Sequence, residues 1–418
     1  MLTGGCVFEA VNGSRSSPVL VAIPGMIVIA TDEAGYGPTL GPLVVAATRW
    51  RVGQFEPIEP IEPIEPIEPI EPIEPIEPIE PIEPIEPIEP IEPIEPIEPI
   101  EPIEPIEPIE PTSRHPGGLA DQLFPRFAFL HSPIDVGGAI VRVDDSKRVH
   151  VPGSSRQKFT GDVKPEPLAI IAMAAAARCG HHPGDHQSLR DAIVRSEPAN
   201  RRTPWTTDPT FDRPLPVSAD PMIKHHHQHE SSARMTGASA VVIEPAALNR
   251  QWIDGKCNKS DLLGETTLSL VADQLTAAAA DADGDGGSDA GIAAVFCDRL
   301  GGRKFYAGLI QHHFPDASLS IIAERRDISV YRLITPAMSI YIHYTVGGDS
   351  FPPVALSSCL AKYFREGSMR RLNGYFGQRI EGLKPTAGYH VDAMRWLRDT
   401  AKYRARHGID PAGLVRNR

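Results

Sequence analysis

The sequence has few aromatic residues, few cysteines and no long apolar run. Phe, Trp and Tyr make up 6% of the 418 residues. Its five cysteines (6, 179, 257, 297 and 359) are far apart, and no two form a Cys-x-x-Cys pair. This spacing argues against a disulfide framework and favours a reducing, cytoplasmic location. The first 25 residues have no basic segment ahead of an apolar stretch, so we expect neither a signal peptide nor a membrane span.

Negative charge is concentrated in one segment. The formal net charge is −13, but a Glu-Pro-Ile repeat from Glu56 to Pro111 contains 19 glutamates, which leaves +6 for the rest. A mildly basic body can approach phosphate groups. Proline at every third position cannot donate to a helix or a sheet, so we expect residues 56–111 to form a polyproline II insert. Its isoleucine stripe could bind an unknown partner, but a tolerated low-complexity loop is the interpretation we favour.

Apolar periodicity predicts an α/β domain with inserts. The predicted strands cover residues 26–30, 42–50, 139–143, 292–296 and 339–345. The predicted helices cover residues 168–179, 262–280, 353–375 and 391–403. We therefore expect residues 26–55 and 112–418 to form one domain, preceded by a disordered extension over residues 1–25.

Residues 180–238 are predicted to form a second disordered or loosely ordered insert. The segment is rich in Pro, His, Ser, Arg and Asp, without periodicity. It includes a histidine cluster at 225–229 that could bind zinc or nickel. Because no cysteine or spaced carboxylate accompanies the cluster, we assign it no role.

Four carboxylates each lie where an apolar strand ends or just beyond it: Asp32, Glu33, Asp298 and Asp349. Such strand ends can converge on one edge of an α/β sheet. Carboxylates clustered without histidine or thiolate suit hard divalent cations such as Mg²⁺ or Mn²⁺. Two such ions can hold a phosphodiester between an activated water and the leaving oxygen. For any one acid, however, a solvated cap or turn is the commoner explanation.

Local motifs resemble those of one enzyme family. The run from Asp32 to Pro42, with Gly35-Tyr36-Gly37 inside it, resembles the first-strand signature of the type 2 ribonucleases H, ribonucleases HII and HIII. Asp145-Ser146-Lys147 is similar to the family's Asp-Ser-Lys element, and residues 261–266 are similar to a family helix start. Asp298 falls at the position of the family's third acid.

The C-terminal part continues this resemblance. Gly348-Asp349-Ser350 and the following residues 355–365 resemble the family's fourth acid and its helix. Lys384-Pro385-Thr386 resembles a Tyr-Pro-Thr segment. These pieces occur in the family's order and cover most of the chain outside the two inserts.

The resemblance implies a ribonuclease H-like mixed central sheet flanked by helices. It implies that Asp32, Glu33, Asp298 and Asp349 bind two Mg²⁺ or Mn²⁺ ions and hydrolyse RNA that is paired with DNA or embedded in it. Asp32 would bridge the two ions. Contacts to the substrate would come from Gly35, Tyr36, Gly37, Lys147, Ser358, Lys362 and Arg365.

Departures from the family's pattern leave other functions open. Tyr36 stands where ribonuclease HII has a basic residue that reads the ribose 2′-hydroxyl, and Lys384 replaces a tyrosine. The separation of Asp298 from Asp349 is long, so that Glu324 and Asp327 compete for the fourth position. One alternative is a nuclease of the same fold with DNA or structured RNA as its substrate. Another is a non-catalytic nucleic-acid-binding or scaffold protein whose repeat recruits partners.

Overall fold

The structure is a computed structural model that describes residues 25–53, 118–149, 166–195, 203–207, 215, 218–253, 258–284 and 291–416. The chain separates into two units, residues 1–55 with 115–418 and residues 56–114. All described residues belong to the first unit. The expected extension, apart from Gly25, and the Glu-Pro-Ile repeat lie outside the described residues.

A mixed seven-stranded sheet is the centre of the described part, in the order β5-β2-β1-β6-β9-β8-β7. Strand β1 pairs antiparallel with β2 and parallel with β6, which in turn pairs parallel with β9. The other pairs are antiparallel. The strands are β1 (Ile27–Ala34), β2 (Leu43–Val52), β5 (Ala233–Ile243), β6 (Ile292–Asp298), β7 (Ser318–Glu324), β8 (Ile328–Ile334) and β9 (Ser339–Thr345).

Of the predicted strands, the one at 139–143 forms outside this sheet. It is β4 (Ala139–Val141), and it pairs only with β3 (Ile134–Val136) in a separate hairpin. The edge of the main sheet beside β2 is formed by β5, which was not among the predicted strands.

The described helices cover both faces of the main sheet. Their bounds are α1 (Leu119–Phe127), α2 (Ser146–Val149), α3 (Pro167–Arg178), α4 (His186–Ile193), α5 (Pro204–Thr207), α6 (Asp220–His227), α7 (Pro245–Ile253), α8 (Lys259–Gly284), α9 (Ala307–His313), α10 (Pro352–Gly377) and α11 (His390–Arg406). Short 3₁₀ turns are η1 (Ala128–His131), η4 (Gly348–Ser350) and η5 (Pro411–Gly413). None of these helices is long and apolar enough to cross a membrane.

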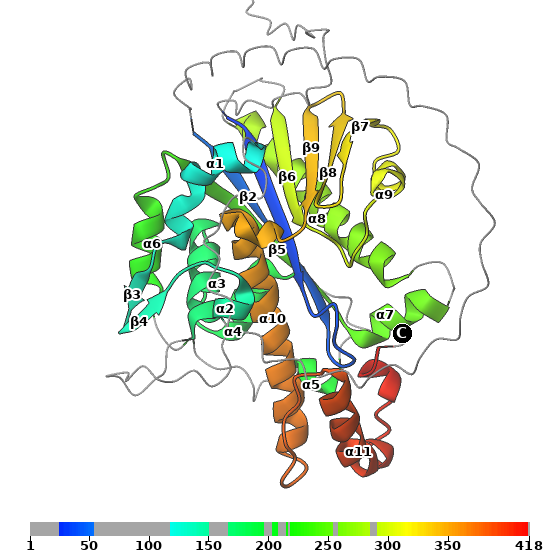
Figure 1. Ribbon diagram of the computed structural model, residues 1–418. Coiled ribbons are helices and arrows are strands. Elements are labelled where there is room, and N and C mark those ends of the chain that lie inside the picture. Colours follow the sequence, from blue (N-terminus) through cyan, green and yellow to red (C-terminus); the bar gives the residue numbers. More distant parts are fainter. Residues whose placement is uncertain are drawn as a thin grey trace, which may run out of the picture. The chain divides into compact units, whose positions relative to one another are not determined.

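Strand alternation divides the core into two layers. Val28 and Ala30 of β1 point to one face, where they join a buried cluster with α1, α3 and α10. Ile29 and Val45 point to the other face and join a cluster with α8 and α9. Figure 1 shows the strands of the sheet and the helices around them. The expected α/β fold with a mixed sheet flanked by helices is confirmed.

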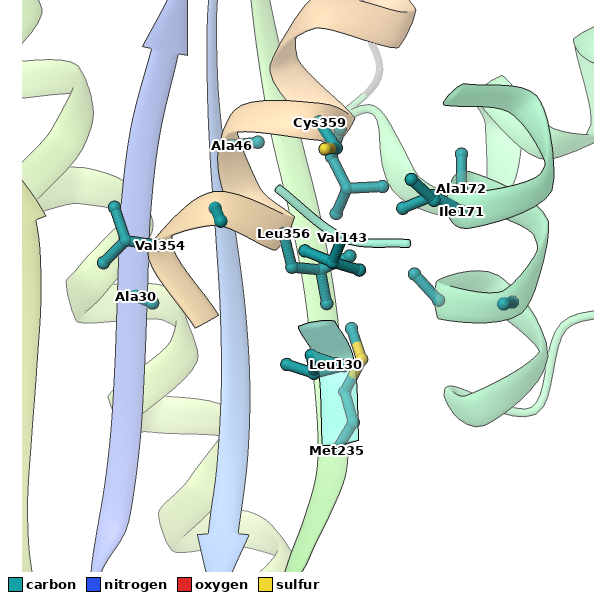
Figure 2. Close-up of a cluster of buried hydrophobic side chains, with 14 of the residues drawn as sticks. Ala30, Ala46, Leu130, Val143, Ile171, Ala172, Met235, Val354, Leu356 and Cys359 are labelled. Atoms are coloured by element: carbon teal, nitrogen blue, oxygen red, sulfur yellow. The ribbon is translucent and has the colours of Figure 1, made fainter. Parts of the chain in front are cut away.

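Helix α10 packs closely on β1 and β2 because the residues between them are small. Ala30 and Ala46 face Val354 and Leu356 in the cluster shown in Figure 2. At the same contact, the Ser357 hydroxyl donates a hydrogen bond of 2.9 Å to the carbonyl of Ala30. The start of α10 is thereby held against the centre of the sheet.

Residues 180–238 differ from the expectation, since much of the segment is regular. It contains α4, α5, α6 and the beginning of β5. Helix α4 is capped by Asp185, which accepts a hydrogen bond from the Ser188 amide, and it buries Leu189 and Ile193. The polar composition hid this short amphipathic pattern.

Candidate active site: carboxylates at the strand ends

The register of the sheet brings Asp32, two residues before the end of β1, beside Asp298, the last residue of β6. The parallel pairing of β1 with β6 reaches Thr31 and Cys297, so that the next residue of each strand is an acid. Asp298 in turn pairs with Thr345, the last residue of β9. The carboxyl ends of β1, β6 and β9 therefore meet at one edge, as predicted.

Asp349 follows β9 in the turn η4, and a backbone contact joins this turn to β6. The Gly348 amide donates a hydrogen bond of 2.9 Å to Oδ1 of Asp298. A Cβ atom at residue 348 would lie 3.0 Å from Cα of Asp298 and 3.1 Å from the carbonyl oxygen of Cys297. The absence of a side chain at Gly348 thus permits the turn that carries Asp349 to approach Asp298 closely.

Glu324 and Asp327, the competing candidates for the fourth acid, belong to the hairpin formed by β7 and β8. Glu324 accepts a hydrogen bond from the Tyr331 hydroxyl. The Asp327 carbonyl accepts one of 2.8 Å from the Val346 amide. Burial, and then the charges of Asp145 and Asp298, in contrast raise the pKa of Asp349. Among the described residues, Asp349 is therefore the acid that η4 places beside Asp298.

Asp32 is buried and the other three acids are half-buried, and the pKa values of Asp32, Glu33 and Asp349 rise. Burial, and then the charges of Glu33 and Asp298, raise the pKa of Asp32 well above its usual value. Burial and the charge of Asp298 raise the pKa of Glu33 to about 7. Burial, Asp145 and Asp298 raise the pKa of Asp349. Solvated caps would not be perturbed in this way, so these acids form an interacting cluster.

The donor atoms fit a hard divalent cation in kind. All four side chains offer carboxylate oxygens, and the Oε2 atom of Glu33 is buried without a hydrogen-bond partner. Across the described ranges, no group of three or more His, Cys, Asp or Glu side chains is arranged as a complete metal site. Binding of an ion would therefore require the carboxylates to draw together.

Ser358 of α10 contacts Asp32, and Ser146 of α2 contacts Ser358 in turn. A hydrogen bond from Ser358 opposes the rise in the pKa of Asp32. The two serine hydroxyls are hydrogen-bonded at 3.0 Å. Ser358 is only 4% exposed. This differs from the expected phosphate contact, because the hydroxyl is enclosed and orients Asp32 instead.

Lys147 is an exposed cation beside the site. It lies in α2, where its amide donates a hydrogen bond of 2.9 Å to Asp145. Its charge opposes part of the rise that burial causes in the pKa values of Glu33 and Asp349. The adjacent Arg148, which was not predicted as a site residue, also opposes the rise in the pKa of Asp349. Lys147 is therefore close enough to interact electrostatically with Glu33 and Asp349, and its contact with phosphate stays a prediction.

The glycine turn after β1 brings exposed backbone to the same edge. Gly35 has a φ of 89°, and a Cβ atom there would lie 2.7 Å from Nε of Arg365. Gly37 is exposed and has open space around its Cα. Gly35 is therefore required for packing, whereas Gly37 leaves the backbone accessible to a ligand.

Tyr36 is half-buried within this turn. Its ring contacts Gly301, and the Lys259 ammonium lies 4.3 Å from the ring centroid. Burial and the charge of Glu33 raise the pKa of its hydroxyl. The ring thus packs against the loop that follows β6.

Two buried arginines contact the glycine turn: Arg365 packs against Gly35, and Arg416 donates hydrogen bonds to the backbone of the turn. Arg365, which we expected to contact phosphate, is 2% exposed and donates a hydrogen bond of 2.8 Å to the Ala387 carbonyl. Arg416 donates to the carbonyls of Gly41, at 2.6 Å, and Gly35. The sequence carried no signal for Arg416, because 381 residues separate it from Gly35.

Two further parts of the resemblance are Lys362 and the segment that contains Lys384. Lys362 forms an ion pair of 3.1 Å with Glu366 and is 18% exposed. The segment with Lys384 reaches the glycine turn through Gly388, whose carbonyl accepts hydrogen bonds from the Thr39 and Leu40 amides at 2.8 and 3.0 Å. The C-terminal segment therefore stabilises the turn through its backbone.

No family model and no curated protein matches the sequence. Solved structures similar to the chain include a chain of the PCNA–RNase HII complex from Archaeoglobus fulgidus, at 12% identity and a TM-score of 0.32, covering 94% of this chain and 95% of that one. The ribonuclease H2 from Pyrococcus horikoshii OT3 is 10% identical with a TM-score of 0.33, covering 93% and 92%. Bst-RNase HIII in complex with Mn²⁺ is 12% identical with a TM-score of 0.32, covering 99% and 74%. Because these values are low, function must be inferred from the side chains above.

Proposed function

We propose that the protein is a metal-dependent endonuclease of the ribonuclease H type, which hydrolyses the RNA strand of RNA–DNA hybrids or ribonucleotides embedded in DNA. The observation that carries this proposal is the cluster of four acids, Asp32, Glu33, Asp298 and Asp349, at adjoining strand ends. Buried like charges are costly unless a cation or a proton compensates them.

The four carboxylates would hold two Mg²⁺ or Mn²⁺ ions. Bound there, such ions activate a water for attack on phosphorus and stabilise the leaving oxygen. Ser358 orients Asp32, and the contact between Gly348 and Asp298 sets the position of Asp349. Lys147 and the exposed backbone of Gly37 lie at the rim, where they would contact substrate phosphates.

A second specificity is favoured by the packing of Tyr36. The phenol is engaged with Gly301 and Lys259 rather than exposed at the tip of the turn. It offers one hydroxyl where a guanidinium would offer a charged fork. Reading of a single ribose at a junction would then be weak, and DNA or structured RNA could be a substrate of the same acids.

Cleavage of three labelled duplexes tests the proposal: an RNA–DNA hybrid, DNA with one ribonucleotide, and all DNA. Each is incubated in magnesium and separately in manganese. We expect cutting of a ribose-containing duplex that is lost in Asp32→Asn, since the amide removes a ligand charge without changing size. Cutting of all DNA alone would favour the second specificity. No cutting, or equal cutting by Asp32→Asn, would contradict the site and favour a binding or scaffold protein.

A further inference from the structure

The segment that follows the third acid, residues 299–306, presents an exposed aromatic ring. Phe305 is 66% exposed, whereas the adjacent Tyr306 is fully buried. The segment contains no acid and three cations: Arg299, Arg303 and Lys304. Of these, Lys304 is exposed directly beside Phe305. Surfaces that bind single-stranded nucleic acids combine aromatic rings and cations in this way.

The backbone on both sides of Phe305 is fixed by contacts with the sheet. The Lys304 carbonyl accepts a hydrogen bond of 2.9 Å from the Ser329 hydroxyl. The Tyr306 amide donates one of 2.9 Å to the Tyr331 hydroxyl. An exposed ring on a backbone that is already held loses little conformational freedom when it binds a partner.

The register of the sheet places Lys304 close to the candidate active site. Strand β8 lies beside β9, and β9 lies beside β6 (Figure 1). Ser329 pairs with Tyr344, which pairs with Cys297, the residue before Asp298. Two strand spacings correspond to about 10 Å, so the contact between Ser329 and Lys304 lies about that far from the third acid. Since one nucleic-acid strand advances about 3.4 Å per nucleotide, about three nucleotides span the distance.

The turn between β7 and β8 adds a further cation on this side of the acids. Arg326 is exposed in the turn, and its carbonyl accepts a hydrogen bond of 2.5 Å from Arg299, the residue after the third acid. The turn also contains the acid Asp327, whose carbonyl accepts a hydrogen bond of 2.8 Å from the Val346 amide, just beyond β9. A strand that leaves the carboxylates toward β8 would therefore meet Lys304 and Arg326.

The kind of base that Phe305 can contact follows from the chemistry of stacking. Inside a duplex each base is already stacked on both of its faces, so an aromatic side chain finds no free face there. The bases of a single strand can be splayed out and stacked on an aromatic ring. One such contact strengthens binding about fivefold or more.

We propose that Phe305 stacks on an unpaired base about three nucleotides from the bond held at the carboxylates, with Lys304 and Arg326 on the adjoining phosphates. The proposal rests on the proposed function, because it places one strand at both sites. It specifies the substrate as a hybrid that continues into a single-stranded segment on the side of β8. The phosphate contacts supply affinity for any strand, and the ring selects the unpaired one.

Binding of two kinds of labelled hybrid tests the role of Phe305. One hybrid is blunt, and the others carry a short single-stranded extension at the 5′ or the 3′ end of either strand. Each is titrated with Asp32→Asn protein in magnesium, so that cleavage does not interfere. We expect one extended hybrid to bind about fivefold or more tightly than the blunt one. Phe305→Ala should abolish this preference, and Phe305→Trp should retain it. A preference that survives in Phe305→Ala, or equal binding of all hybrids by the parent, would overturn the proposal.

A fluorescent base locates the contact. Aminopurine loses emission when it stacks on an aromatic ring, and it can replace each base of the extension in turn. In the preferred hybrid it should be quenched by the parent protein at a position about three nucleotides from the expected cut. The same position should not be quenched by Phe305→Ala. Equal quenching by both proteins would overturn the assignment of the ring.

The salt dependence of binding tests the two cations. Each lost phosphate contact should lower the slope of log affinity against log salt by about one. We therefore expect Lys304→Gln and Arg326→Gln each to lower the slope for the extended hybrid by about one. Unchanged slopes in both variants would overturn their assignment to phosphates.

Ile334→Ala and Arg234→Gln are the matched controls. Both residues are exposed at the end of the sheet opposite the acids, where Ile334 lies beside Ser339 at the start of β9 and Arg234 beside Arg51 near the end of β2. Ile334→Ala should keep the preference, Arg234→Gln should keep the slope, and thermal unfolding should show that all variants fold. Equal losses in the controls would overturn the assignment.

The outcomes separate this proposal from the proposed function. A preference that Phe305→Ala retains, together with cleavage of a ribose-containing duplex by the wild type, would overturn the stacking contact alone. A preference that depends on Phe305, in a protein that cuts no ribose-containing duplex, would support the single-strand contact and overturn the proposed nuclease.

Discussion

The amide of Gly348 donates a hydrogen bond of 2.9 Å to the carboxylate of Asp298, although 50 residues separate them in the sequence. The interval contains α9, β7, β8 and β9, and β7 and β8 extend the sheet beyond β9. The long separation of the third and fourth acids is therefore taken up by a helix and by strands at the sheet edge. The two acids remain together.

Substitution Gly348→Ala should separate these acids. The added Cβ would press on the backbone of Asp298 and Cys297, which cannot move aside as a side chain can. We expect cleavage of the hybrid to fall by about tenfold or more, since small displacements of catalytic groups are costly. Unfolding should become easier by about 1–3 kcal/mol. Gly308→Ala in α9 is the control, because nothing lies within 4 Å of its added methyl. Full activity in Gly348→Ala would show that the contact is unimportant.

Ser358→Ala should weaken the hold on Asp32. Removal of the hydroxyl deletes the hydrogen bonds to Asp32 and Ser146. We expect the magnesium concentration for half-maximal cleavage to rise, with a loss of about 1–2 kcal/mol in unfolding free energy. Ser329→Ala, which deletes a buried hydroxyl bonded to the Lys304 carbonyl, should cost similar stability without changing the magnesium requirement. If Ser329→Ala raised the magnesium requirement as much as Ser358→Ala does, Ser358 would have only a packing role.

Arg416→Gln should loosen the glycine turn from the C-terminal side. The guanidinium bonds two carbonyls of that turn, and the Arg416 amide also donates to the Thr39 carbonyl at 2.9 Å. Charge-assisted bonds of this kind contribute about 1.5–3 kcal/mol each. We expect lower thermal stability and a raised KM for duplex. Arg416→Lys should rescue little, because an ammonium lacks the fork. A variant equal to wild type in both measurements would contradict this role.

His343 should make stability depend on pH. It is buried on β9 beside Phe296, and burial lowers its pKa from 6.5 to about 4. Below pH 6.5 the unfolded chain takes up a proton that the folded chain excludes, so the free energy of unfolding falls with falling pH. The loss should reach about 3 kcal/mol near pH 4. Denaturant unfolding from pH 8 to pH 4.5 should show a shallower dependence in His343→Gln. Equal slopes would mean that His343 is solvated.

Asp32, Glu33 and Asp298 could be predicted because the apolar runs at 26–30 and 292–296 stop just before them. Gly35 followed from the same motif. Ser358 and Arg365 were predicted as substrate contacts, whereas the structure buries both, and that burial depends on how α10 lies on β1. Arg416 could not be found, because its partners are fixed by the tertiary fold alone.

The segment 180–238 shows the limit of reasoning from composition. Its polar residues suggested disorder, yet Leu189 and Ile193 suffice to anchor α4. Strand β5 begins within this segment and completes the sheet beside β2. Short elements of this kind are stabilised by the surface they cover, which a local pattern does not reveal.

Strand β7 is the last strand of the described sheet, and its outer backbone edge invites pairing with another chain. Ile321 on this strand is 55% exposed, and an exposed apolar side chain at that edge would favour association with another chain. The register slips between Ile321 and Ala323, and such a bulge twists the strand out of the flat geometry that intermolecular sheets need. The irregularity between Ile321 and Ala323 therefore works against intermolecular pairing at this edge of the sheet, which lies at the opposite end of the strand order from β5.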